Sequence, residues 1–278
     1  MANYTAADIK ALRERTGAGM MDVKKALDEA NGDAEKAIEI IRIKGLKGAT
    51  KREGRSTAEG LVAAKVAGGV GVMIEVNCET DFVAKADKFI QLADKVLAVA
   101  VESGAADLET LLATEVDGKP LSEVVVEEGA VLGEKVVVRR IARLEAATVD
   151  AYLHKTSKDL PAQVGVLFAV DGEGEAAATA AHDVAVHIAA MSPNYLSRED
   201  VPADLVESER RIAEETAKAE GKPEAAMTKI VEGRVTGFYK GEVLLDQAFA
   251  KDAKKSVAQV LEEAGVKGTA FARFRVGS

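Results

Sequence analysis

A basic segment interrupted by glycines divides this chain into two unequal parts. Residues 44–59 contain five lysine or arginine side chains and three glycines, and this composition cannot bury much apolar surface. We therefore expect a flexible, exposed linker at 47–59 between a head at 1–46 and a larger body. Charge supports this division, because residues 1–58 hold 12 basic and 9 acidic side chains, whereas the remainder holds 25 basic and 37 acidic ones.

The head carries the boundary signals of a small three-helix bundle. Thr5 is a suitable N-cap for a first helix, and Leu12 lies on the apolar face of that helix. Gly17-Ala18-Gly19 predicts a break, and Asn31-Gly32 is typical of a helix C-terminus. Asp33 then predicts the cap of a third helix. Bundles of this size often serve as docking modules.

The body begins with the pattern of a β-hairpin. Apolar runs at Leu61–Val66 and Val70–Val76 flank Gly68-Gly69, a dipeptide that favours a tight turn. A long helix follows, with Phe89 and Ala100 among the apolar residues at helical spacing. The hairpin and this helix predict a first subdomain at 60–143.

A similar order of elements returns later in the body. Strand signals occupy residues 136–170, and an alanine-rich helix follows from about Glu175 to Ala190. Because strands followed by a helix occur twice, we predict two related α/β subdomains with antiparallel sheets, the second at 144–278. The fold class is therefore α+β.

The second subdomain contains a segment of different character. Residues 203–235 hold two charged amphipathic runs around a Gly221-Lys222-Pro223 turn, which predicts a protruding antiparallel helical hairpin. The tail then predicts a strand at Glu242–Leu245, a helix at Asp252–Glu263 that begins at Asp252, and a last strand at Ala270–Val276.

Composition excludes several classes of protein. The net charge of −9 argues against nonspecific binding of nucleic acid by the whole chain. Cys78 is the only cysteine, so no intramolecular disulfide, redox pair or cysteine zinc cluster can form. Neither a signal peptide nor an apolar run of membrane-spanning length occurs in the sequence. We expect a cytoplasmic protein with no membrane partner.

Motifs for catalysis or nucleotide binding are missing from the sequence. The glycine cluster at 68–71 lies in the predicted hairpin turn and not between a strand and a helix, as a phosphate-binding loop requires. His182 and His187 are five residues apart, so they do not share a helix face for a metal. No nucleophile motif of the Gly-x-Ser-x-Gly type occurs. We expect no cofactor, no bound metal or nucleotide, and no enzymatic activity.

One short segment combines an acid with a large apolar ring where a strand passes into a helix. It is Thr80-Asp81-Phe82-Val83. In one interpretation, Thr80 or Asp81 caps the helix and Phe82 packs beneath it. In the other, the ring and the neighbouring carboxylate are displayed to a partner. Phenylalanine is more often buried than displayed, so the residues alone favour the first interpretation.

Two long runs in the sequence resemble the elongation factor Ts family. The first is Leu12–Leu27, with the sequence LRERTGAGMMDVKKAL, and the second is Glu79–Ala84, with the sequence ETDFVA. Shorter matches follow in the family's order at His187–Ala190, Glu232–Arg234 and Arg273–Gly277. The matches cover nearly the whole chain, and the first two are long and specific.

The resemblance implies a ubiquitin-associated-like head, two related core subdomains and a helical hairpin. It also implies a partner, elongation factor Tu, in its GDP-bound and nucleotide-free forms. In the family, an Asp-Phe pair enters beside the partner's nucleotide and magnesium site and promotes GDP release, so that GTP can bind. Carried onto this chain, the pair is Asp81 and Phe82, with Thr80 and Val83 as neighbouring contacts.

The resemblance implies two further contacts with elongation factor Tu. The head contacts the GTPase domain of the partner, and Lys24 and Lys25 are its candidate residues. The second subdomain grips a distant domain, and His154 matches a family contact residue there. Some members continue beyond the last strand into a C-terminal helix that also contacts the GTPase domain. This chain ends at Ser278, so we expect that contact to be missing.

Other interpretations of these residues remain open. An exposed lysine pair is as often merely solvated, and a lone histidine is more often structural. A different protein class, an adaptor whose basic linker contacts ribosomal RNA, would show binding that weakens steeply with salt. An enzyme using Glu79 and Asp81 as an acid and base pair ranks below both.

Overall fold

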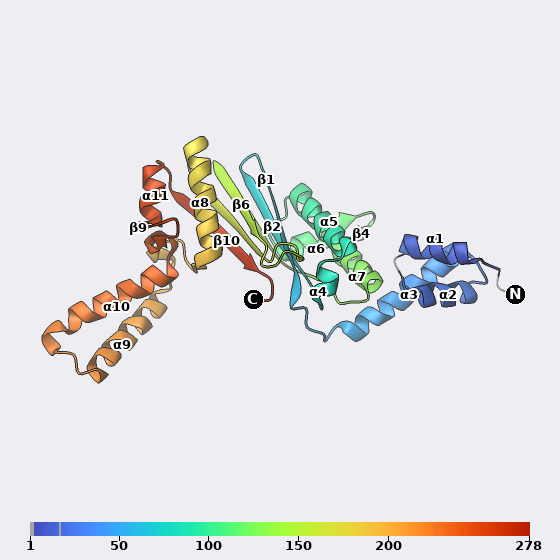
Figure 1. The fold of residues 1–278 in the computed structure, drawn as a ribbon, viewed down its shortest axis with the longest axis horizontal. Coiled ribbons are helices and arrows are strands. Elements are labelled where there is room, and N and C mark those ends of the chain that lie inside the picture. Colours follow the sequence, from blue (N-terminus) through green and yellow to red (C-terminus); the bar gives the residue numbers. More distant parts are fainter. Residues whose placement is uncertain (1–2, 17) are drawn as a thin grey trace.

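The computed structural model of this chain describes residues 3–16 and 18–278, so Gly17, part of the predicted helix break, lies outside the described residues. The described part is elongated, with the head at one end, the helical hairpin at the other and the body between them (Figure 1). The α-helices are α1 (Ala6–Thr16), α2 (Met20–Glu29), α3 (Ala34–Arg52), α4 (Asp81–Ala84), α5 (Asp87–Ser103), α6 (Leu108–Ala113), α7 (Leu121–Leu132), α8 (Glu175–Met191), α9 (Ala203–Ala219), α10 (Met227–Glu242) and α11 (Val257–Glu263). The strands are β1 (Glu59–Ala67), β2 (Val70–Cys78), β3 (Glu115–Val116), β4 (Lys119–Pro120), β5 (Val137–Glu145), β6 (Thr148–His154), β7 (Val164–Val170), β8 (Ala248–Phe249), β9 (Asp252–Ser256) and β10 (Gly268–Arg275).

The head is a three-helix bundle whose predicted caps are confirmed. The N–H and the hydroxyl of Thr5 both donate to Asp8 Oδ2 at 2.7 Å, and the Asp8 N–H returns a bond to the Thr5 hydroxyl at 3.3 Å. Asp33 Oδ1 accepts from the N–H groups of Glu35 and Lys36, the second and third residues of α3, both at 3.1 Å. Inside the bundle, α1 and α2 bury Leu12 and Leu27. Local capping chemistry thus sets where these helices begin.

The third helix corrects the predicted linker. α3 continues to Arg52, so the prediction of a flexible linker at 47–59 is wrong for residues 47–52. Tertiary packing explains the difference. A Cβ atom on Gly45 would lie 2.9 Å from the Cβ of Ala130, so this glycine lets α3 lie closely against α7. Arg42 also donates through Nε to Glu127 Oε1 on α7 at 2.8 Å.

Two three-stranded antiparallel sheets form the body, in the orders β1-β2-β5 and β10-β7-β6. The predicted hairpin is confirmed, with Gly68 and Gly69 at positive φ between β1 and β2. β5 pairs with β2 and continues to Glu145, so the first sheet runs two residues past the predicted subdomain boundary at 143.

The two sheets pack face to face, and helices cover their outer faces (Figure 1). Along β2, Val72, Ile74 and Val76 face the cluster that contains α5 and α7, while Met73 faces Leu167 of β7 in the second sheet. β7 is buried along its whole length, because one face meets the first sheet and the other meets α8. This explains the uninterrupted apolar sequence of β7.

Glycine marks the closest approach of the two sheets. A Cβ atom on Gly71 would lie 2.6 Å from a methyl group of Val149, and one on Gly165 would lie 2.4 Å from a methyl group of Val62. No real Cβ atom tolerates such distances, so both positions need glycine for the sheets to pack.

The predicted helical hairpin is confirmed as α9 and α10, but two predictions for the tail are wrong. Glu242 is the last residue of α10, and Leu244–Asp246 form a 3₁₀ turn where a strand was expected. Asp252 begins strand β9 and does not cap a helix. Ser256 caps α11 instead, through a reciprocal capping box with Gln259 at 3.2 and 2.9 Å. Among the described residues, no helix combines the length and apolarity needed to cross a membrane.

Arg140, which forms an ion pair within the first sheet, also joins that sheet to the last strand. The Glu75 carboxylate is fully buried and accepts from Arg140 Nε at 2.6 Å. Arg140 also donates through Nη2 to the Arg275 carbonyl at 3.0 Å, and its guanidinium lies 4.5 Å from the centre of the Phe274 ring. The two predicted subdomains therefore share polar as well as apolar contacts.

Candidate functional site

The segment that carries Asp81 and Phe82 is a short connector between β2 and α5. Within it, α4 is a single helical turn, and Thr80 is its N-cap. The Val83 N–H donates to the Thr80 hydroxyl at 3.4 Å, and the Ala84 N–H donates to the Thr80 carbonyl at 3.1 Å. Ala84 is buried and Val83 packs partly against the core, so one face of the turn is anchored.

The Phe82 ring lies on the opposite, solvent side and is 72% exposed. The interpretation that it packs beneath the helix is therefore wrong, while the expected cap is present at Thr80. Lys85, one turn further, places Nζ 4.5 Å from the ring centre and 3.7 Å from the Asp81 carboxylate. The connector thus displays an apolar ring beside an anionic group, both in contact with one cation.

Two carboxylates hold the base of this connector. Glu134 accepts from the backbone N–H groups of Glu79 and Thr80, both at 3.0 Å, and from the Thr80 hydroxyl at 2.5 Å. Glu79 in turn accepts from the Lys135 N–H at 2.6 Å and from Arg55 at 3.0 Å. Desolvation alone would raise the pKa of Glu79, but these donors outweigh it and leave the pKa below its usual range.

Cys78 lies directly beneath the connector. Its Sγ donates to the Thr80 carbonyl at 3.3 Å, and the side chain is fully buried. Burial, with a smaller contribution from the Glu134 charge, raises the pKa of this thiol to about 12. The thiol therefore stays protonated at neutral pH and is a packing group with low nucleophilicity.

His154 lies exposed at the end of β6, within a cluster of polar and aromatic side chains. Tyr152 places its hydroxyl 3.2 Å from His154 Nδ1, and His182 on α8 places Nδ1 3.2 Å from Asp150 Oδ2. The Tyr152 and His182 rings meet edge to face at 6.1 Å. Burial raises the pKa of Asp150 and outweighs the nearby His182. The alternation of a strand could have linked residues 150, 152 and 154, whereas nothing in the sequence placed His182 beside them.

Lys24 and Lys25 are both exposed on α2. Beside them, Met20 and Met21 are 58% and 63% exposed, which sequence reasoning missed although both methionines stand in the quoted family run. Figure 1 shows α2 near one end of the molecule and α4 near its middle, so the head lysines and Phe82 lie on separate surfaces.

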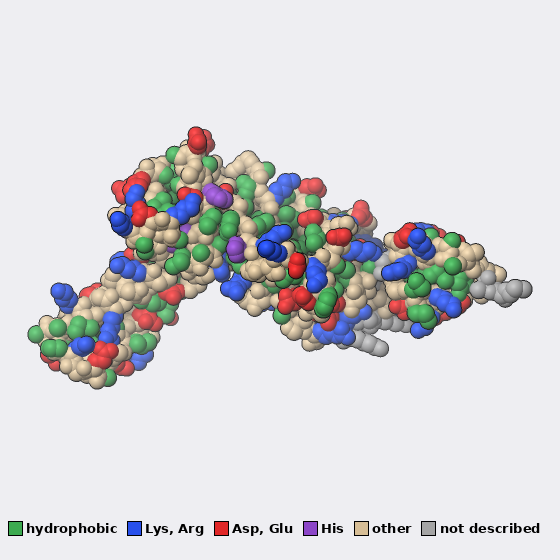
Figure 2. All heavy atoms as spheres, viewed as in Figure 1, with side chains coloured by type: hydrophobic (Ala, Val, Ile, Leu, Met, Phe, Trp, Pro, Cys, Tyr) green, Lys and Arg blue, Asp and Glu red, His purple; other side chains and the backbone are tan. Residues whose placement is uncertain are grey.

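On the helical hairpin of α9 and α10, positive and negative side chains are interspersed across the face visible in Figure 2.

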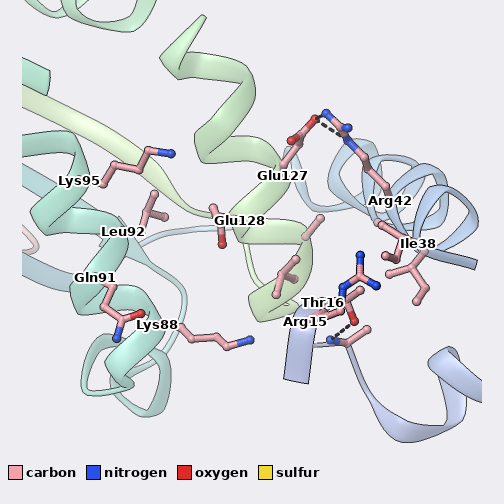
Figure 3. Close-up of a pocket in the computed structure, with 15 residues that line it drawn as sticks. Arg15, Thr16, Ile38, Arg42, Lys88, Gln91, Leu92, Lys95, Glu127 and Glu128 are labelled. Atoms are coloured by element: carbon pink, nitrogen blue, oxygen red, sulfur yellow. Dashed lines mark hydrogen bonds and ion pairs between the residues drawn. The ribbon is translucent and has the colours of Figure 1, made fainter. Parts of the chain in front are cut away.

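A cavity of about 540 Å³ lies between the head and the body. Figure 3 shows Lys88, Gln91, Leu92 and Lys95 of α5 on one side and head residues on the other, with Arg42 paired to Glu127 across the junction. Glu127 also accepts from Lys119 at 2.8 Å, so one carboxylate holds cations from both parts. The head is therefore docked on α7 by packing and by charge.

No group of three or more His, Cys, Asp or Glu residues in the described ranges 3–16 and 18–278 is arranged to hold a metal ion. His187, one of the family matches, is buried and bonded within the fold. Its Nε2 lies 2.8 Å from Gln247 Oε1, and its Nδ1 accepts from the Ala250 N–H at 3.1 Å. This histidine is therefore a structural group.

This chain is similar to known proteins over its whole length. A family model described as Elongation factor TS matches residues 79–278. Proteins named Elongation factor Ts from Arthrobacter sp. (strain FB24), Renibacterium salmoninarum and Kineococcus radiotolerans are 97%, 80% and 58% identical to this chain over 278 residues. Each of these comparisons covers 100% of this chain and 100% of the relative. This chain therefore belongs to the elongation factor Ts family.

Proposed function

We propose that this chain promotes GDP release from elongation factor Tu by inserting Phe82 and Asp81 beside the partner's nucleotide and magnesium site. The observation that carries the proposal is the 72% exposed Phe82 ring on a connector whose other face is anchored. An exposed ring of this size gains free energy when a partner buries it. Asp81 stands next to it with its side chain half exposed, so both groups can enter one crevice.

Burial of the Phe82 ring alone cannot account for a large acceleration of GDP release. Accelerating release by about 10⁴-fold requires a barrier lowered by about 5.5 kcal/mol. Burying one phenylalanine supplies only about 1.5–3 kcal/mol. Insertion of the ring must therefore be combined with loss of magnesium coordination, which leaves the phosphate charge of GDP uncompensated. Exchange forms and breaks no covalent bond, so this role requires no catalytic groups in the chain.

Two further surfaces hold the partner while the ring enters. We assign the head surface with Lys24 and Lys25 to the GTPase domain of elongation factor Tu, and the surface around His154 to a distant domain. Exposure of all three side chains supports this assignment. Binding of this chain and binding of GDP to elongation factor Tu weaken each other by the same factor, as linkage requires. Once GDP has left, GTP can bind to the empty nucleotide site. The proposed place of action is the cytoplasm.

The direct test is the rate of fluorescent GDP release from elongation factor Tu with and without this protein. We expect a large acceleration that saturates with protein concentration and falls when Phe82 is replaced. An unchanged rate at saturating protein would refute the proposed function. The same titration at several salt concentrations tests the RNA-adaptor alternative, because phosphate-dominated binding of RNA would weaken steeply with salt.

A further inference from the structure

The connector that carries Phe82 is bonded at its base to a single carboxylate from a distant part of the chain. Glu134 lies two residues after the end of α7, and three donors from Glu79 and Thr80 converge on it at 2.5–3.0 Å. Bonds to an ionised acceptor are about twice as strong as bonds between neutral groups. Glu134 therefore fixes the backbone of residues 79–80 from outside the connector.

The bonding is reciprocal. Glu79 accepts from the Lys135 N–H at 2.6 Å, so each of the segments 79–80 and 134–135 donates hydrogen bonds to the other. The Lys135 ammonium also donates to the Glu53 carbonyl and, at 3.3 Å, to the Arg55 carbonyl. The chain leaving the head is thus tied to Lys135, the residue that follows Glu134.

One atom passes this restraint on to Phe82. The Thr80 hydroxyl donates to Glu134 and accepts from the Val83 N–H, which closes the turn of α4 around Phe82. An isolated helical turn of four residues is unstable in water, because nucleation fixes several residues for very few bonds. The exposed ring has little packing of its own, so the direction in which it points depends on how firmly the turn is held.

We propose that Glu134 is a positioning residue for Phe82, which holds the α4 turn so that the ring is already oriented before a partner binds. This inference rests on the proposed exchange function. Without Glu134, the turn opens in part, and only a fraction of molecules presents the ring correctly. The apparent efficiency of insertion falls to that fraction of the wild-type value, while the head and the His154 surface still bind.

A purely structural role for Glu134 predicts a different result, namely loss of stability with no selective loss of exchange. Cys78 supplies a local probe that separates the two, because it is the only cysteine and lies buried under the connector, bonded to the Thr80 carbonyl. The rate at which a thiol reagent modifies Cys78 in the native protein reports local opening of residues 78–80.

Three variants of the full chain test the proposal. Glu134→Ala removes both acceptor oxygens. Glu134→Gln removes the same charge but keeps one oxygen for the N–H groups and an amide donor for the Thr80 hydroxyl. Glu123→Ala, at an exposed position on α7, is the matched control for losing a carboxylate. Each variant is measured for melting temperature, affinity for elongation factor Tu, GDP release at saturating protein, and Cys78 modification.

For Glu134→Ala we expect GDP release at saturation to slow by about ten-fold or more, as the loss of bonds to a charged acceptor implies, and Cys78 modification to accelerate by a similar factor. We expect Glu134→Gln to stay within about three-fold of the wild type in both measurements, and Glu123→Ala to match it.

Two outcomes overturn the proposal. One is wild-type exchange by Glu134→Ala. The other is a loss of exchange equal in Glu134→Ala and Glu134→Gln, which would assign the effect to charge. Failure of the proposed function has a separate signature, because wild-type protein and Phe82→Ala would then release GDP at the same rate.

Discussion

The ammonium group of Lys85 lies 4.5 Å from the centre of the Phe82 ring, one helical turn away. A cation over an exposed aromatic ring contributes about 0.5–1 kcal/mol. This is less than the gain from burying the ring in a partner, about 1.5–3 kcal/mol. Lys85 therefore contacts the exposed ring in the free protein without preventing its transfer into a crevice.

Replacing Phe82 by alanine should abolish most of the acceleration of GDP release and leave the fold intact. The ring is exposed, so its removal creates no cavity, and losing its contact with Lys85 should change the free energy of unfolding by about 1 kcal/mol at most. Much of the binding to elongation factor Tu should remain, since the other surfaces are unchanged. A stopped-flow measurement of GDP release and a thermal melt check both parts.

Phe89 provides the matched control for that experiment. It lies seven residues further along, in α5, and is fully buried in the first core cluster. Phe89→Ala should cost about 3–5 kcal/mol of stability. Normal exchange per folded molecule is expected for this variant. If Phe82→Ala proved as destabilising as Phe89→Ala and exchanged normally when folded, the insertion model would be refuted.

Removing residues 1–55 should weaken association with elongation factor Tu and leave the body folded. The structure adds a consequence, because α3 packs on α7 and its removal uncovers Ala130 and part of the face around it. The melting temperature of the truncated protein should therefore fall by a few degrees, by about 4 °C for each 1 kcal/mol lost. Calorimetric titration and circular dichroism measure the two effects. Unchanged affinity, or an unfolded body, would contradict the docking role of the head.

His154→Ala should reduce affinity for elongation factor Tu without lowering the melting temperature, since the side chain is exposed and its bond to Tyr152 lies at the surface. Loss of a surface bond within the protein costs at most about 1 kcal/mol. Equilibrium binding with labelled elongation factor Tu is the measurement. Affinity equal to that of the wild type would remove His154 from the partner-binding surface.

Stability should fall as the pH drops below about 6.5, the ordinary value for histidine, because of His187. Burial lowers the pKa of His187, against a smaller opposing effect of the bond to Gln247. Its Nδ1 already accepts from the Ala250 N–H, so a proton there would face another donor. Below the unfolded pKa and down to the folded pKa, the unfolded chain binds a proton that the folded chain does not, and stability is lost.

The measurement is a series of melting curves between pH 7.5 and 5.5. Below about pH 6.5, and as far as the folded pKa, His187 alone should cost the wild type at most about 1.4 kcal/mol for each pH unit, whereas between pH 7.5 and 6.5 the loss should be small. His187→Gln, which cannot take up a proton, should show a flatter dependence even if it is less stable at every pH. Parallel curves for the two proteins would show that other groups cause the acid sensitivity.

Local signals in the sequence predicted local structure well. Thr5, Asp33 and Gly68-Gly69 act through bonds or dihedral angles within a few residues, and each is found where the sequence placed it. Predictions failed where a distant segment decides the outcome. The glycines from Gly45 onward were interpreted as part of a segment unable to bury apolar surface, but the missing side chain of Gly45 is what lets α3 lie against Ala130. The error at Asp252 has a local cause instead, because a capping box between Ser256 and Gln259 starts the helix at Val257.

The candidate site shows the same division. The motif from Thr80 to Val83 could be found in the sequence, and the family resemblance singled out His154. The direction of the Phe82 ring could not, because it depends on which side of a single turn packs against the core. Glu134 could not be found either, since 54 residues separate it from Thr80 and no local pattern links the two.

The packing of one sheet on the other limits how the protein can move. Gly71 and Gly165 bring the sheets so close that neither can slide or rotate without collisions between backbone and side chains. Phe82 is attached to the first sheet and His154 to the second, so the span between these two proposed contacts is set by a shared core. If both engage elongation factor Tu at once, the strain of fitting that span falls on the partner, whose domains must shift to match it.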